Sequence, residues 1–137
     1  MFFKKEIGKD QDYKLTKIAS LLIHAAKIDQ NYSNKEKYII ESTLLELGAK
    51  KEKLKAIISE AIENEKNSVQ ILDFTKEVKN MNEDEKIKII ETLWRIIYSN
   101  KDADSYETNL MRRLAGLLYV DSKIMGDIKD RIEKENL

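Results

Sequence analysis

The sequence contains no cysteine, no proline, four glycines and one histidine, His24. The lack of cysteine excludes disulfides, zinc fingers, iron–sulfur clusters and thiol catalysis, and a lone imidazole excludes any site that needs two. The 25 basic and 25 acidic residues give zero net charge, so the chain lacks the basic bias expected of a nucleic-acid binder, and we expect no nucleic-acid partner. A composition that is 36% charged and 42% hydrophobic, without proline, is typical of a helical protein.

The length of 137 residues suits one ordinary domain, which can bury a sufficient core without a metal or a disulfide. The first residues lack the apolar core of a secretory signal, and the longest uncharged run, Ile18 to Ala26, is far shorter than the ~20 residues of a membrane span. We therefore predict a single cytoplasmic domain over residues 1–137 that is not itself transmembrane, with residues 1–11 loosely ordered.

Apolar residues recur at helical spacing along the chain, and this periodicity predicts about seven helices and no strand. The first helix runs from about Asp12 to Ile28. A capping box formed by Ser33 and Glu36 opens the second, which stops at Gly48. A third runs through Leu54 to Ile62, and the predicted N-caps of the remaining four helices are Ser68, Asn82, Asp104 and Asp121.

When the sequence is aligned with itself at the offset that pairs Ser33 with Asp104, the second half of the chain matches the first. We call this alignment the repeat register. Apolar positions coincide over three helices, and the helix caps follow, so that Glu36 falls on Glu107. Chance alignment of amphipathic helices is the weaker explanation, because the loop length and the caps agree as well. We predict an all-α fold of two pseudo-symmetric three-helix units, about 12–66 and 83–137, joined by a short helix.

The loop between the first two helices of each unit collects oxygen ligands. The first loop presents Asp29, Asn31, Ser33 and Glu36, and the second presents Asn100, Asp102, Asp104 and Glu107. Carboxylate and amide oxygens suit Ca²⁺, Mg²⁺ or Mn²⁺ rather than zinc or copper, although the spacing is not that of an EF-hand. The candidate metal ligands are Asp29, Glu36, Asp102, Asp104 and Glu107.

Each of these residues also has an explanation without an ion. Glu36 and Glu107 stand at the third helical position, where reciprocal capping accounts for them, and Asp29 can bond its own turn. His24 is interpreted as a surface or boundary residue and Trp94 as a core anchor. A small basic cluster, Lys101, Arg112 and Arg113, is interpreted as part of a solvated salt-bridge network.

The segment from Leu93 to Lys123, LWRIIYSNKDADSYETNLMRRLAGLLYVDSK, resembles the tellurite-resistance TerB-like family. In that family a helix ends in an Ala-Asp-Gly turn, a Glu follows seven residues after the Asp, and an Arg-Arg pair precedes a Leu-Leu. This segment has Asn100 and Lys101 in place of the Asp and Gly and keeps Glu107. The segment LLIHAAKIDQNYSNKEKYII is similar to the family's first copy and keeps Asp29 and Glu36.

The resemblance implies a seven-helix fold with internal pseudo-symmetry and acidic loops that are proposed metal sites. The chain also resembles the TerB-like domain of membrane-anchored J-domain co-chaperones of the DjlA type. This resemblance implies a protein partner, and for the co-chaperones a membrane-associated one. Because Asn100 is a neutral ligand and Lys101 repels cations, we expect any divalent site to lie in the first unit, at Asp29 and Glu36.

No nucleophile–base pair and no glycine-rich phosphate loop is visible in the sequence. The first hypothesis is therefore a non-enzymatic TerB-like interaction domain, with or without a divalent cation, in stress response or envelope-associated assembly. The alternatives are a metal-dependent small enzyme, such as a hydrolase, and a purely structural adaptor without an ion.

Overall fold

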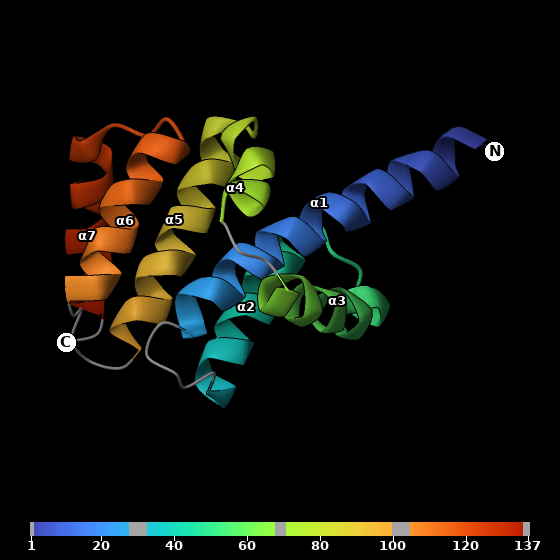
Figure 1. Ribbon diagram of the computed structural model, residues 1–137, viewed down its shortest axis with the longest axis horizontal. Helices are drawn as coiled ribbons and strands as arrows, with labels where there is room; N and C mark the ends of the chain where they lie inside the picture. Colours follow the sequence, from blue (N-terminus) through green and yellow to red (C-terminus); the bar gives the residue numbers. More distant parts are fainter. Residues whose placement is uncertain (1, 28–32, 68–70, 100–104, 136–137) are drawn as a thin grey trace.

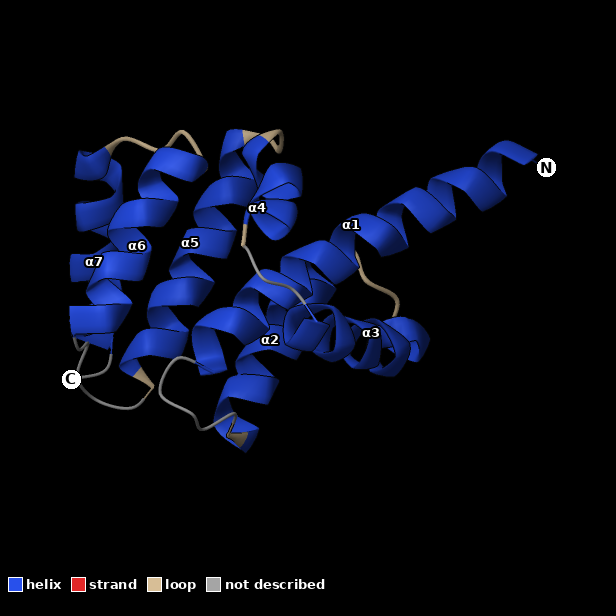
Figure 2. Ribbon diagram, viewed as in Figure 1, coloured by secondary structure: helices blue, strands red, loops and turns tan. Residues whose placement is uncertain are grey.

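The computed structural model describes residues 2–27, 33–67, 71–99 and 105–135, with the backbone alone for 2–10 and 105–107. This part of the chain folds into seven α-helices and a short 3-10 turn and contains no strand (Figures 1 and 2), which confirms the predicted all-α fold. The elements are α1 (Phe2–Lys27), α2 (Asn34–Glu46), η1 (Lys51–Lys53), α3 (Leu54–Asn67), α4 (Leu72–Lys79), α5 (Glu83–Tyr98), α6 (Ser105–Leu117) and α7 (Ser122–Glu135).

Helix α1 begins at Phe2, well before the predicted start at Asp12, so residues of the segment predicted to be loosely ordered form its first turns. The segment has no proline, and its Lys, Glu and Gln residues favour helix, so the single Gly8 does not end it. The amino-terminal half of α1 projects beyond the other helices (Figure 1). No helix among the described residues is long and apolar enough to cross a bilayer.

The packing centres on α1 and α5. Helix α3 packs along α1 and α7 packs along α5, while α4 contacts both α1 and α6, and α1 and α2 each contact α5. One cluster of buried apolar side chains runs from Leu15 to Ile132, and Ile89, Ile90 and Leu93 of α5 are fully buried within it. The helix that opens each predicted unit therefore forms the centre of the core.

The observed helix boundaries follow the repeat register. Helix α2 (34–46) maps onto 105–117, which are the bounds of α6. The last residue of α1, Lys27, maps onto the last residue of α5, Tyr98, and Lys51 at the start of η1 maps onto Ser122 at the start of α7. These boundaries support the repeat, and superposition of the two units stays a prediction.

Three predicted N-caps are confirmed. Ser33 caps α2, the Asn82 side chain accepts a hydrogen bond from the Glu85 amide at 2.9 Å, and the Asp121 side chain accepts one from the Lys123 amide at 2.8 Å. Helix α4 begins at Leu72 and follows Ile71, which makes no side-chain cap. The predicted cap of α4, Ser68, is therefore wrong, because Ile71 holds the N-cap position. The predicted cap of α6, Asp104, lies outside the described residues.

Candidate functional site

The start of α2 carries the one predicted metal ligand whose side chain is described. The Ser33 hydroxyl accepts a hydrogen bond from the Glu36 amide at 3.2 Å, and Glu36 Oε1 accepts one from the Ser33 amide at 2.9 Å, which completes the predicted capping box. Glu36 is 1% exposed. A buried carboxylate needs compensation, which the amide hydrogen bond and the positive end of the helix dipole supply here.

The other four predicted ligands are not brought together by the described structure. Glu107 lies in the first turn of α6, where its backbone alone is described, and Asp29, Asp102 and Asp104 lie outside the described residues. Within the part of the chain that the structure describes, no three His, Asp or Glu side chains come close enough to hold a metal ion. The assignment of all five residues as ligands stays a prediction.

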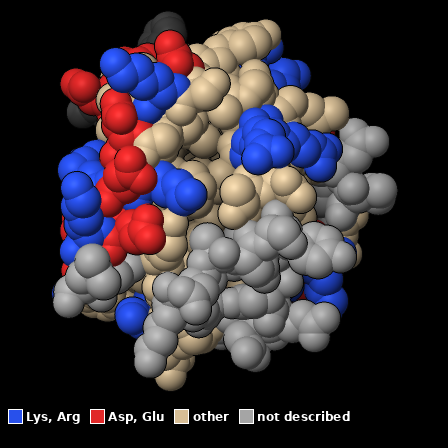
Figure 3. All heavy atoms as spheres, turned by 90° about the vertical axis from the view of Figure 1, so that its left-hand side faces the viewer, with Lys and Arg blue, Asp and Glu red and all other residues tan. Residues whose placement is uncertain are grey.

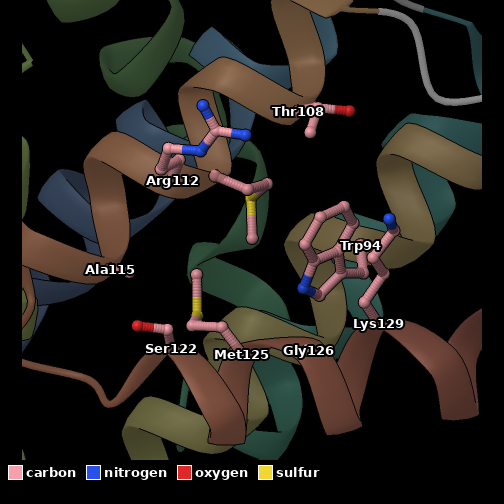
Figure 4. Close-up of a pocket in the computed structure, with 9 residues that line it drawn as sticks. Trp94, Thr108, Arg112, Ala115, Ser122, Met125, Gly126 and Lys129 are labelled. Atoms are coloured by element: carbon pink, nitrogen blue, oxygen red, sulfur yellow. The ribbon is translucent and has the colours of Figure 1, made fainter.

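A pocket of about 230 Å³ opens between α5, α6 and α7. Its lining is mainly apolar, with one aromatic ring, two thioethers and a helical glycine, and two basic side chains complete it. The lining includes Trp94, Met111, Arg112, Met125, Gly126 and Lys129 (Figure 4). On the face that α7 presents, an uncharged area is bordered by basic and acidic side chains (Figure 3).

The indole of Trp94 has an unusual environment in this pocket. The side chain is 3% exposed, so its predicted role as a core anchor is confirmed, and its Nε1 has no hydrogen-bond partner among the described residues. In Figure 4 this nitrogen points into the pocket, toward the side where Ser122 and Met125 lie. An unsatisfied buried donor costs about 1–3 kcal/mol, so an acceptor brought into the pocket would be stabilised there.

Two cationic side chains border the same pocket. The Lys129 ammonium lies 5.7 Å from the centre of the Trp94 ring, within cation–π range, and Arg112 extends from α6 with its side chain exposed. Lys101, which the sequence assigns to the same basic cluster, lies outside the described residues. The basic cluster of the sequence thus contributes one of its members, Arg112, to the wall of the pocket.

A second recess, of about 360 Å³, lies between α4 and the carboxyl end of α6. Leu72 and Tyr119 line it although they are 47% and 69% exposed. Lys76 and Lys79 make it basic, and the Lys79 ammonium lies 4.9 Å from the centre of the Tyr119 ring. We call this recess the α4–α6 groove.

Side-chain contacts connect the opening helix of each unit to its last helix. His24 Nδ1 lies 3.3 Å from Glu65 Oε1 at the end of α3, which confirms His24 as a boundary residue. At the equivalent position in the repeat register, Arg95 bonds both carboxylate oxygens of Glu135 at 3.1 Å. This hydrogen-bonded pair raises the pKa of Arg95 and lowers the pKa of Glu135, and burial raises the pKa of Tyr98 nearby.

Sequence reasoning misses both recesses. The apolar stripe places Trp94 in the core, but a stripe does not show whether an indole N–H finds a partner. Gly126, in the interior of α7 with open space beside it, is the available signal, because helix interiors disfavour glycine. Leu72 lies within the predicted fourth helix, and its exposure follows from how α4 meets α6.

The fold and the sites define a class, an all-helical domain whose helix boundaries repeat in one register and whose recesses lie around its sixth helix. A family model described as tellurite resistance protein TerB matches residues 15–130. The match covers most of the chain, and the protein belongs to the TerB family. Neither the curated proteins nor the solved structures include a match.

Proposed function

We propose that this TerB-family chain is a non-enzymatic interaction domain that binds another protein at the α4–α6 groove. The observation that carries the proposal is the joint exposure of Leu72 and Tyr119 in one recess. Adjacent large apolar side chains that face solvent mark interaction sites more often than isolated ones do. Burying both against a partner would remove apolar surface from water at about 25 cal/mol per Å².

The charge of the groove narrows the kind of partner. Lys76 and Lys79 flank the apolar residues, so the complementary segment carries an apolar side chain beside acidic ones. The Lys79–Tyr119 contact holds the ring and the ammonium together at the groove. We place such an interaction in cytoplasmic stress response or envelope-associated assembly, with a partner that can itself be membrane-associated.

The test is site-specific photocrosslinking in cells. A photoreactive phenylalanine analogue at Tyr119 should yield a discrete crosslinked protein, and a second substitution, Leu72→Asp, should abolish that product. The matched control is the same analogue at Tyr38, which is 72% exposed on α2, away from the groove. A product at Tyr38 of equal yield, or a Tyr119 product that survives Leu72→Asp, would overturn the assignment of the groove.

We further propose that any cation site lies in the first unit, at Asp29 and Glu36, and binds Ca²⁺, Mg²⁺ or Mn²⁺. What supports it is the burial of the Glu36 carboxylate, which follows Asp29 closely in the sequence. A ligand that prefers the folded state raises the melting temperature by mass action, so thermal unfolding with each cation should show a shift. Calorimetric titration of Asp29→Asn should then show weakened binding.

The capping box supplies the competing explanation, and two variants separate the two. If capping alone explains the site, Ser33→Ala should cost about 0.5–2 kcal/mol and Glu36→Gln little, because Gln can still reach the Ser33 amide. If a cation is held, Glu36→Gln should lower the free energy of unfolding more than Ser33→Ala does. This difference should appear only when the cation is present. Binding that Asp29→Asn leaves undiminished would remove the first-unit site.

A further inference from the structure

The pocket between α5, α6 and α7 is separate from the α4–α6 groove and uses other residues of α6. It combines an unpartnered indole N–H, on a side chain that is 3% exposed, with two cations at its edge. An N–H donor and two cations all favour an acceptor that carries negative charge. The pocket is therefore complementary to an anionic acceptor.

The remaining lining determines what the acceptor is attached to. Met111 and Met125 line the pocket with thioethers, and Met125 lies across from the Trp94 ring (Figure 4). Ala115 adds a methyl group, so the interior is mainly apolar. Unbranched thioether side chains can shift to admit a ligand and make favourable contacts with aromatic rings. A dry cavity of roughly 150 Å³ holds benzene, so a pocket of about 230 Å³ has room for one ring with a short acidic arm.

Gly126 lines the pocket and has open space beside it. It lies inside α7, where no positive φ requires glycine, and a Cβ placed on it would meet nothing within 4 Å. Glycine in a helix interior is less stable than alanine by roughly 0.5–1 kcal/mol, so neither the backbone nor the space around it explains this residue. A larger side chain at this position would extend into the pocket.

We propose that this pocket binds a small apolar carboxylic acid, with its apolar body between Met111, Met125 and Trp94 and its carboxylate bonded by Arg112 and Lys129. The Arg112 guanidinium and the Lys129 ammonium are mobile enough to close on the carboxylate, since the former is exposed and the latter half-buried. One carboxylate oxygen then accepts a hydrogen bond from Trp94 Nε1, and the thioethers of Met111 and Met125 shift to admit it.

The probe is 3-phenylpropionate, and its control is 3-phenylpropanol, which has the same ring and chain length without the charge. Trp94 is the chain's single tryptophan, so its fluorescence reports on this pocket alone. We expect a saturable fluorescence change with 3-phenylpropionate. Binding of 3-phenylpropanol should be weaker by at least about tenfold, because the alcohol loses the charge-assisted contacts with Arg112 and Lys129.

Variants localise the binding. Arg112→Gln and Lys129→Gln should each lower the affinity for 3-phenylpropionate at least about fivefold. The matched control is Arg113→Gln, at an exposed neighbour that does not line the pocket, and its affinity should stay within about twofold of the parent's. Gly126→Leu should abolish binding by filling the space, and Gly126→Ala should retain it. Thermal unfolding of each variant verifies that it is folded, and the glutamine variants keep the test valid should Gly126→Leu fail to fold.

Three results would overturn the proposal. The first is the absence of any fluorescence change at millimolar 3-phenylpropionate. The second is an equal affinity for 3-phenylpropanol, which would remove the role of the carboxylate. The third is equal weakening by Arg112→Gln and Arg113→Gln, which would indicate a general charge effect rather than a site.

Discussion

Gly48 and Tyr119, which are equivalent positions in the repeat register, both adopt left-handed backbone conformations, with φ of 106° and 57°. They lie just after the ends of α2 and α6. The amides after the two helices also bond to equivalent carbonyls, Gly48 to Leu45, Ala49 to Leu44, Tyr119 to Gly116 and Val120 to Ala115. Both helices therefore end in the same way, in the Schellman pattern, with glycine in one unit and tyrosine in the other.

Tyrosine at the second of these positions carries a steric cost, because a left-handed conformation brings Cβ close to the following carbonyl oxygen. We expect Tyr119→Gly to be more stable than Tyr119→Ala by about 1 kcal/mol, since both remove the ring and its contact with Lys79 and only glycine removes the Cβ. Urea unfolding monitored by circular dichroism measures the difference.

Gly126 provides the control for this comparison, because it is helical with open space beside it. There the order should reverse, with Gly126→Ala more stable than the parent by about 0.5–1 kcal/mol. If alanine exceeded glycine in stability at position 119 as well, the left-handed conformation of Tyr119 would not be the source of the cost.

The end of α6 also receives a side-chain cap from α5. Lys86, which is 8% exposed, donates from Nζ to the Leu118 carbonyl at 3.0 Å. Its removal leaves a buried carbonyl unsatisfied, so we expect Lys86→Met to lower the free energy of unfolding by about 1–3 kcal/mol. The control is Lys88→Met, which breaks a surface ion pair with Glu46 and should cost at most about 1 kcal/mol. Equal losses in chemical denaturation would contradict the role of Lys86.

A buried hydroxyl pair joins α2 to α5. The Oγ1 atoms of Thr43 and Thr92 lie 2.7 Å apart, and Thr92 also donates to the Lys88 carbonyl at 2.9 Å, so Thr43 is the donor of the pair. We expect Thr43→Val and Thr92→Val each to cost about 1–2 kcal/mol and the double variant less than their sum, because it leaves no hydroxyl of the pair unsatisfied. Additive losses in a double-mutant cycle would show that the hydroxyls act independently.

This pair marks a limit of sequence reasoning. In the repeat register Thr43 falls on Leu114 and Thr92 on Leu21, and all four are buried. Periodicity and capping patterns predict helices, their ends and the buried face, because those follow from neighbours along the chain. They do not predict that two hydroxyls from separate helices meet, since this depends on how α2 is placed against α5.

The same distinction applies to the candidate sites. The capping box of Ser33 and Glu36 is predictable because it is local, and the structure confirms it. The pocket at Trp94 needs residues from three helices, and apart from Gly126 inside α7 nothing in the sequence indicates it. The hydrogen bond from Lys86 to the Leu118 carbonyl is equally unpredictable from the sequence. In the repeat register Lys86 falls on Leu15, a core residue, and nothing near Lys86 in the sequence indicates this bond.

The Arg95–Glu135 pair, which joins α5 to α7, should make stability depend on pH. The hydrogen bond from Arg95 lowers the pKa of Glu135 from its ordinary value of 4.5, so the pair contributes stability above that value, and the contribution is lost as pH falls through the lowered pKa. Glu135→Gln should cost about 0.2–1 kcal/mol near neutral pH, because exposed pairs are screened by water, and nearly nothing at about pH 2. Urea unfolding of parent and variant at both pH values measures this. A Glu135→Gln loss that stays constant down to acid pH would assign the effect to packing rather than to charge.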